Sequence, residues 1–244
     1  MLNAEVKRAL DVRRLGLVKY DEALDIQRHL VEERKADRIP DQLLLLEHPA
    51  VITLGVKTRD DRSHVIASAE TLAREGVEVF ESGRGGDVTF HGPGQLVGYP
   101  ILDLHPDRLD VHRYVRDLEE VMIRVAASFG VIAGRQPGWT GAWVDVGGGR
   151  HEKLAAIGVR IARWITSHGF AFNVTTNLEH FNLIVPCGIA DADKGVTSLE
   201  RLLGRHVPMV EVEDAAIAAI AEVFERRPQV HAASDLSRPS PVSY

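Results

Sequence analysis

Apolar residues in the first third of the chain come in runs that are too short for helices. Leu43 to Leu46 and Val51 to Leu54 each hold four residues, and Glu47-His48-Pro49 separates them. Four residues complete little more than one helical turn but suit a buried strand, so this segment predicts two strands joined by a turn. A further strand is expected at residues 77–80.

Residues 96–104 also favour an extended conformation, but they contain Pro100. Proline cannot donate a hydrogen bond to a neighbouring strand. The segment is therefore expected at the edge of a sheet or at the end of a strand rather than in a central position. Three later segments, residues 142–144, 154–161 and 170–174, have the apolar pattern of strands.

Helical spacing is clearest at residues 110–129, where Val115, Leu118, Met122, Val125 and Phe129 recur at intervals of three and four. This pattern predicts a core-facing helix that Gly130 ends. Residues 20–34 and 216–224 predict two more helices. Groups of strands beside a few long helices favour an α/β class of the α+β-like kind, with a mixed sheet flanked by helices, over a doubly wound sheet.

The chain has 244 residues, and no linker or charge run divides its middle. We expect a single domain over residues 1–227. Residues 228–244 are polar and contain three prolines, so a disordered tail is expected there.

The first 17 residues lack the apolar core of a secretory signal. The single cysteine cannot form an internal disulfide, so nothing argues for an oxidising compartment, and a cytoplasmic location is expected.

The distribution of charge argues against two classes of partner. The formal net charge is -6, and lysines and arginines are scattered among acids. No basic stripe marks a nucleic-acid or membrane surface, and no segment is long enough to span a bilayer.

The 11 histidines lack metal-ligand spacing. No metal site is therefore expected.

The segment from Arg84 to Gln95 concentrates specialised residues between two expected strands. It holds four glycines, a proline, an arginine and a histidine. It is neither a P-loop nor a dinucleotide fingerprint. A glycine-rich turn is one interpretation. The alternative is a binding loop, in which Gly85 and Gly86 admit a ligand close to the backbone while Arg84 contacts an anionic or carbonyl group.

Cys187 and Lys153 are the candidates for covalent chemistry. Pro186 and Gly188 bracket the thiol, but a buried, inert cysteine is the alternative. An unperturbed thiol has a pKa of about 8.5 and supplies little thiolate at neutral pH, so a nucleophilic role requires a cationic or basic neighbour. Lys153 opens an apolar strand and is either solvated or partly buried, and only a buried lysine would have a lowered pKa and exchange a proton with a thiol.

Taken together, these segments resemble the lipoyl(octanoyl) transferase family. Four blocks carry the resemblance, in the family's order, and the second is too long for a chance match. They are LLLLEHPAVITLG (residues 43–55), RGGDVTFHGPGQLVGYP (84–100), KLAAIGVRIARWITSHGFAFNV (153–174) and FNLIVPCGI (181–189). The resemblance implies a fold like the catalytic domains of lipoate and biotin protein ligases.

The resemblance also implies roles for individual residues. Cys187 would be the acyl-thioester nucleophile and Lys153 its catalytic partner. Phe90 stands where the family more often has tyrosine. The implied acyl-binding positions are Arg84, Gly85, Gly86, Asp87, Val88, Thr89, Phe90, His91, Ala156, Ile157, Gly158, Gly169, Phe170 and Ala171.

The implied reaction is octanoyl transfer from octanoyl-acyl carrier protein to a lysine of a lipoyl domain, in lipoate biosynthesis. The acceptors would be the E2 subunits of 2-oxoacid dehydrogenases and the glycine cleavage H protein. No cofactor is implied, and the enzyme is expected to be a monomer. Two alternatives stay open: an ATP-dependent lipoate or biotin protein ligase, and a non-catalytic module that binds the carrier or a lipoyl domain.

The basic residues expected to face an acidic carrier are Lys57, Arg59, Arg62, Arg84, Arg150 and Arg163.

Overall fold

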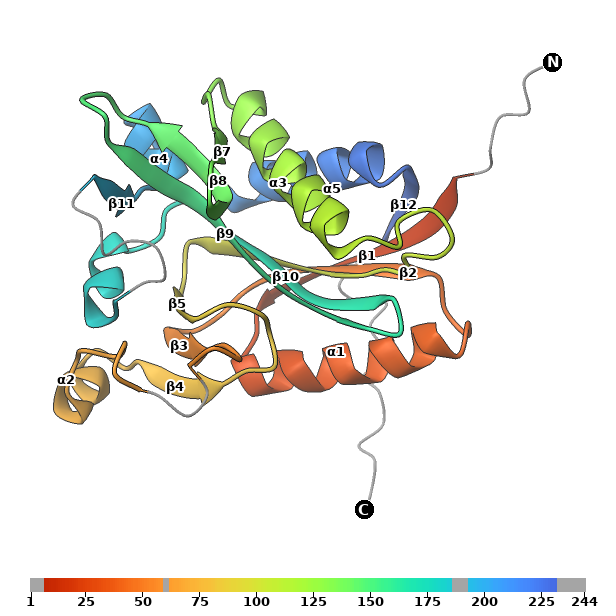
Figure 1. Ribbon diagram of the computed structural model, residues 1–244, viewed down its shortest axis with the longest axis horizontal. Helices are drawn as coiled ribbons and strands as arrows, with labels where there is room; N and C mark the ends of the chain where they lie inside the picture. The colour runs from red at the N-terminus through yellow and green to blue at the C-terminus, as the bar shows by residue number, and fades with distance from the viewer. Residues whose placement is uncertain (1–6, 59–61, 186–192, 232–244) are drawn as a thin grey trace.

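A large mixed sheet forms the centre of the computed structural model, which describes residues 7–58, 62–185 and 193–231. Within these residues the strand order is β12-β1-β2-β6-β10-β9-β8-β7, and β11 pairs with β9 (Figure 1). β1 pairs in parallel with β2 and β12, whereas β2, β6, β10, β9 and β8 pair antiparallel. The strands are β1 (Arg8–Leu17), β2 (Asp41–Glu47), β6 (Gln95–Ile101), β7 (Gly134–Gln136), β8 (Trp139–Asp145), β9 (His151–Ala162), β10 (Ile165–Asn173), β11 (Lys194–Val196) and β12 (Arg226–His231).

A second, smaller sheet lies beside the first and has the order β4-β3-β5. Its strands are β4 (Glu78–Glu81), β3 (Val51–Leu54) and β5 (Val88–His91). Helix α2 (Ala69–Arg74) and the 3₁₀ helix η1 (Leu178–Leu183) pack against this sheet, and β5 contacts η1. The Gly-rich segment, Arg84 to Gln95, therefore follows β4, contains β5 and reaches the first residue of β6 in the large sheet.

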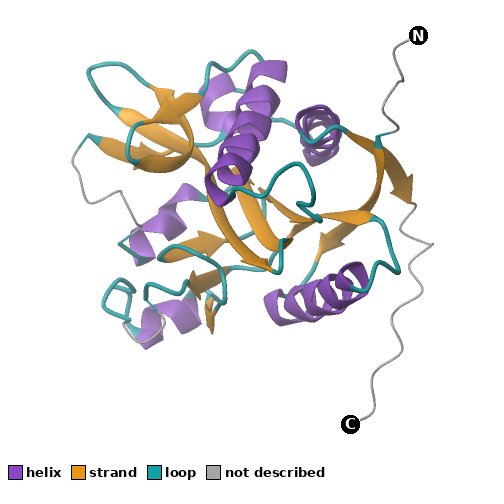
Figure 2. Cartoon of the chain, turned by 45° about the vertical axis from the view of Figure 1, so that its right-hand side comes forward, coloured by secondary structure: helices purple, strands orange, loops and turns teal. Residues whose placement is uncertain are grey.

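Helices cover both faces of the large sheet (Figure 2). α1 (Tyr20–Lys35) packs on one face, and α3 (Val111–Ser128) and α5 (Met209–Val223) pack on the other, with the short α4 (Leu199–Leu203) on the same side as α3. The leucines of β2 explain why two cores form. Leu43 and Leu45 point into the α3/α5 core, whereas Leu44 and Leu46 point into the α1 core. Alternation along one strand thus buries both faces.

The mixed α/β class and the three long helices are confirmed. The helix expected at residues 110–129 is α3, and the Asp110 side chain caps it by accepting from the N–H groups of His112 and Arg113. The edge position that Pro100 favours is wrong, because β6 is central and Pro100 pairs with Leu43. The proline lies at the end of that strand, beyond the residues that pair with β10. There the Thr166 hydroxyl donates to the Pro100 carbonyl and accepts from the Leu102 N–H, which replaces the interrupted ladder.

The sequence does not predict two outer strands of the large sheet, β1 and β12. β1 is not predicted, because its buried Leu10 and Val12 are its only fully buried residues and lie among charged ones, Arg8, Asp11, Arg13 and Arg14. Residues 228–231, expected in a disordered tail, instead form part of β12 and pair with β1. β12 is an exposed edge strand, so it carries no apolar alternation, and its Pro228 is tolerated there. In the described parts of the chain, no helix is long and apolar enough to cross a membrane.

Candidate functional site

A cavity of about 550 Å³ lies where the Gly-rich segment meets β9 and β10. Its wall runs from exposed residues, such as Lys57 and Thr140, to buried ones, such as Tyr20, Tyr99 and His168. The cavity therefore has an open mouth and a closed, polar end. Apolar side chains of β9, β10 and α3 also line the cavity, among them Ile157, Phe170 and Val115.

Fourteen of the sixteen residues singled out in the sequence line this cavity. The two others are Phe90 and Cys187. The Phe90 ring is buried beside Phe181 and His180 and lies outside the cavity wall. Cys187 lies outside the described residues. The lining residues are Arg84, Gly85, Gly86, Asp87, Val88, Thr89, His91, Lys153, Ala156, Ile157, Gly158, Gly169, Phe170 and Ala171.

Arg84 holds the Gly-rich loop in place. Its guanidinium is buried and donates to the carbonyl and hydroxyl oxygens of Thr53 and to the Gly85 carbonyl. The next residue closes the loop onto the sheet, because the Gly85 N–H donates to the Val159 carbonyl of β9. The side chain of Arg84 thus joins the loop to β3.

Lys153 is half-buried on β9, opposite Trp143 of β8. Its Nζ atom lies 4.6 Å from the centre of the Trp143 ring. Its backbone pairs with Val196 of β11, the strand that follows residues 186–192, and its carbonyl accepts from the Thr197 N–H. After residues 186–192, the described chain resumes at Asp193, whose carbonyl accepts from the His151 N–H.

A buried chain of hydrogen bonds links the Gly-rich segment to the same place. His91 Nδ1 lies 2.7 Å from Gln95 Oε1, and Gln95 Nε2 donates to Asn173 Oδ1 over 2.9 Å. Asn173 Nδ2 then donates to the Thr197 carbonyl over 2.9 Å. Since Thr197 is also bonded to Lys153, this chain fixes Lys153 relative to β5, β6 and β10.

Aromatic and imidazole rings cluster at the closed end. Burial lowers the pKa of His48 to about 4 and that of His168 to about 4. Burial, together with the nearby His48 and Arg84, lowers the pKa of His91 to about 3. All three rings are therefore neutral at pH 7. Tyr99, whose pKa burial raises well above its usual range, has its hydroxyl 2.8 Å from Nε2 of His48.

Several residues that line the cavity were not predicted as site residues. Tyr20 belongs to the apolar side of its helix, which predicts burial and not a place in a cavity. Gln95 and Asn173 fall inside the segments that carry the family resemblance, but their spacing predicts no function. Trp139 and Thr140 come from β8, and only the pairing of β8 with β9 brings them to the mouth.

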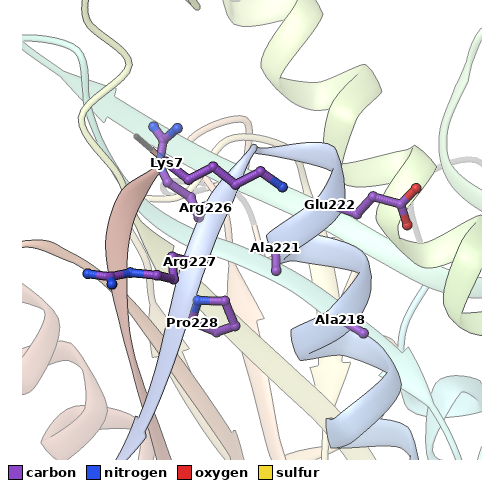
Figure 3. A pocket seen from close by; sticks show the side chains of 7 residues that line it. All are labelled: Lys7, Ala218, Ala221, Glu222, Arg226, Arg227 and Pro228. Carbon is purple, nitrogen blue, oxygen red and sulfur yellow. The ribbon is translucent and has the colours of Figure 1, made fainter. Parts of the chain in front are cut away.

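A second hollow of about 540 Å³ lies along α5 and β12 (Figure 3). None of the residues that line it was singled out in the sequence. Arg226, one of them, bonds with Asp41 and with the Phe224 carbonyl, which is a structural role. The candidate site is therefore the cavity that contains Lys153.

Comparisons of the sequence with known protein families and with individual proteins agree on one family. The sequence profile of the lipoyl protein ligase A/B catalytic domain matches residues 19–221. An octanoyltransferase of Rubrobacter xylanophilus is 53% identical over 222 residues, which are 90% of this chain and 96% of that protein. An octanoyltransferase of Myxococcus xanthus is 52% identical over 217 residues, which are 88% of this chain but 60% of the relative.

Solved structures agree on the fold. The bipartite lipoate protein ligase of Thermoplasma acidophilum superposes with a TM-score of 0.65 at 15% identity, covering 91% of this chain and 88% of that one. A biotin protein ligase of Aquifex aeolicus, in complex with biotin and ATP, gives a TM-score of 0.51 at 12% identity, covering 89% and 70%. At these identities the likeness concerns the fold alone.

Proposed function

This chain belongs to the family of the lipoyl protein ligase A/B catalytic domain and is an octanoyltransferase of lipoate biosynthesis, and we propose that it carries the octanoyl group as a thioester on Cys187. The observation that most supports this proposal is the cavity, which unites Lys153 with the Gly-rich loop and the apolar residues of β9 and β10. The proposed donor is octanoyl-acyl carrier protein. The proposed acceptors are lysines in the lipoyl domains of 2-oxoacid dehydrogenase E2 subunits and in the glycine cleavage H protein.

In the first half-reaction, Lys153 as the free amine takes the proton of the Cys187 thiol. The thiolate attacks the carbonyl carbon of the donor thioester, and a new carbon–sulfur bond forms. The bond to the carrier's sulfur then breaks, and the Lys153 ammonium returns its proton to that sulfur. The carrier leaves as a thiol, and the amine form of Lys153 is restored.

In the second half-reaction, the uncharged amine of the acceptor lysine attacks the octanoyl carbonyl on Cys187. An amide bond forms, the carbon–sulfur bond to Cys187 breaks, and Lys153 passes the amine proton to the departing sulfur. A thioester is converted into an amide, which is favourable without a nucleotide. The proposed reaction therefore requires no ATP, unlike that of a lipoate or biotin protein ligase.

The cavity suits the acyl chain. Its wall contains apolar side chains, including Ile157, Val159 and Phe170. Each methylene removed from water there contributes about 0.8 kcal/mol. An octanoyl tail thus gains several kcal/mol of binding free energy without any charged contact.

The decisive experiment is intact-protein mass spectrometry after brief mixing with octanoyl-acyl carrier protein in the absence of ATP. The wild type is expected to gain one octanoyl group that hydroxylamine removes, whereas Cys187→Ala gains none. Lys153→Ala should acquire the group much more slowly, while Lys35→Ala, which removes a half-buried lysine paired with Glu32, serves as the matched control. An adduct that demands ATP would favour the ligase, and no adduct at all would favour the binding module.

We also propose a basic surface near the mouth that receives the acidic carrier. Lys57 lines the cavity, and Lys57, Arg62 and Arg150 are exposed. Arg163 is exposed too, but it follows β9 whereas Arg150 precedes that twelve-residue strand, so Arg163 does not belong to this surface. Arg84 is buried and bonded to Thr53, so it does not belong to this surface, and Arg59 lies outside the described residues. Reversing the charge of Lys57 should slow formation of the acyl-enzyme more at low salt than at high salt. An unchanged salt dependence would argue against the surface.

Two further proposals concern the protein as a whole. We propose that it acts in the cytoplasm, where octanoyl-carrier thioesters and lipoyl domains would meet, and that it is a monomer. Light scattering after gel filtration should give a mass near 26.9 kDa. A mass twice as large would replace the monomer with a dimer.

A further inference from the structure

Trp143 and Lys153 occupy opposite positions on the antiparallel strands β8 and β9. Opposite residues of paired strands project from the same face of a sheet. Trp143 is 2% exposed, and the Lys153 Nζ atom lies 4.6 Å from the centre of its ring. This separation falls within the range of cation–π attraction, which is strongest for tryptophan.

The stem of Lys153 packs against the same strand. A methyl group at Gly141 would lie 3.7 Å from the Lys153 Cε atom and only 2.3 Å from the Ala155 carbonyl oxygen. Gly141 has a φ of +121°, which a side chain would strain. Its N–H donates to Oε1 of the fully buried Glu119, so α3 fixes this part of β8. The strand thus holds both the stem and the charged end of the lysine.

A second lysine extends the arrangement. The rings of Trp139 and Trp143 lie 6.5 Å apart in a T-shaped contact, and Lys194 Nζ lies 5.0 Å from the centre of the Trp139 ring. Lys194 also bonds with Asp193. Each of the two tryptophan rings of β8 thus contacts one ammonium group, that of a lysine on β9 or on β11.

We infer that Trp143 is a positioning residue for Lys153: its ring holds the ammonium group at the cavity wall and favours the charged form of the lysine. The inference rests on the proposed role of Lys153 as the proton acceptor of Cys187. When the proton moves from thiol to amine, the ammonium forms against the ring. The ring therefore favours the thiolate–ammonium pair over the thiol–amine pair, and thiolate is the form that attacks.

Other charged groups lie near Lys153 and define what the test must separate. On β9, Glu152 neighbours Lys153 and faces Arg150 and Arg201. At the start of β11, Lys194 pairs with Asp193, the residue before the strand, and His151 lies opposite Lys194. Replacing Trp143 removes none of these groups. A change in the titration of Lys153 upon that replacement therefore reports on the ring.

The test measures the titration of Lys153 directly. Wild type, Trp143→Phe and Trp143→Leu are labelled with a trace of isotopic acetic anhydride between pH 6 and pH 11, and the acetylation of Lys153 is quantified by peptide mass spectrometry, with Lys35 as the internal reference. Trp143→Leu is expected to lower the pKa of Lys153 by about 0.5 to 1.5, the range that loss of a cation–π contact implies. Trp143→Phe should lie between the other two.

The same comparison is repeated in the Cys187→Ala background, where no thiol can pair with Lys153. If the ring acts as inferred, the order of the three Lys153 pKa values persists in this background. Trp164→Phe, at the turn between β9 and β10, is the control and should titrate like the wild type. If leucine and tryptophan at position 143 give the same Lys153 titration, or if phenylalanine behaves like leucine, the ring only fills space and the inference is wrong.

Acyl-enzyme formation supplies the second measurement. With the ring removed, the midpoint of the pH–rate profile should move to a lower pH, because Lys153 then loses its proton at a lower pH. The maximal rate of acyl-enzyme formation should fall severalfold, because less thiolate forms. Labelling needs no acyl donor, so its result stands even if no thioester forms on Cys187. Failure of this inference and failure of the proposed function are therefore distinguishable.

Discussion

Gly98 of β6 and Phe170 of β10 lie opposite each other, and the phenyl ring occupies the space where a side chain at position 98 would stand. A methyl group at Gly98 would come 2.1 Å from the Phe170 Cζ atom. Phe170 is 2% exposed and forms part of the cavity wall. The shape of that wall therefore depends on a position that carries no side chain.

We expect Gly98→Ala to displace the Phe170 ring toward the cavity. Overpacking of this kind typically lowers the free energy of unfolding by about 1–3 kcal/mol. The displaced ring should also slow acylation by octanoyl donors more than by butanoyl donors, because the longer chain reaches further along the wall. Thermal unfolding and acyl-enzyme formation with the two donors check both effects. Gly134→Ala is the control, since a methyl group there meets nothing within 4 Å, and equal behaviour of the two variants would contradict the prediction.

The buried histidines predict how stability depends on pH. Burial lowers the folded-state pKa of His48, His91 and His168 to between about 3 and 4, below the ordinary value of 6.5. As the pH falls below 6.5, the unfolded chain binds protons that the folded chain does not. The free energy of unfolding therefore decreases between pH 6.5 and pH 4, by up to about 1.4 kcal/mol per pH unit for each histidine.

Urea unfolding at half-unit steps between pH 7 and pH 4.5 measures this slope. His168→Gln should make the loss of stability less steep, because one of the three differential protons is removed. His29→Gln, on the exposed side of α1, should leave the slope unchanged. Equal slopes for wild type and His168→Gln would mean that His168 does not contribute.

The elements with strong periodicity were predictable from sequence. Helix α3 has apolar residues at every third or fourth position and an Asp110 cap, and both features are local. Leu43 to Leu46 indicated a strand that is buried on both faces, as β2 is. β1 and β12 were missed because charged residues interrupt their few apolar positions and because each is stabilised mainly by pairing with distant residues.

The site was predictable in part for a related reason. Arg84, Gly85 and Gly86 form an unusual local sequence, so they could be singled out before any contact was known. The contact between Trp143 and Lys153 depends on the pairing of β8 with β9 and on the bulge near Ala142, which one sequence does not specify. The burial of Arg84 was equally hidden, because its partner Thr53 lies 31 residues away.

The hydrogen-bond chain through Asn173 predicts a loss of both stability and activity. Asn173→Ala leaves Gln95 Nε2 and the Thr197 carbonyl without this partner, and each buried group left unsatisfied costs about 1–3 kcal/mol. Because Thr197 bonds with Lys153, the rate of acylation should fall more than stability alone explains. Rates at a temperature where the variant stays folded check this expectation. Asn182→Ala, on the exposed side of η1, is the control, and a full rate in folded Asn173→Ala would contradict a positioning role.

The ion pairs of Asp41 predict how the C-terminal strand is held. Asp41 is buried and accepts from Arg34 Nε over 2.9 Å and from Arg226 Nε over 2.7 Å. Arg226 begins β12, so Arg226→Leu should cost about 3–5 kcal/mol by leaving the carboxylate short of one partner. The effect should be largest in β12, because the pair ties this edge strand to β2. Hydrogen exchange is expected to accelerate at residues 226–231 of Arg226→Leu and to stay unchanged in Arg227→Leu, whose side chain is exposed. Equal exchange in both variants would show that backbone pairing with β1 alone holds the strand.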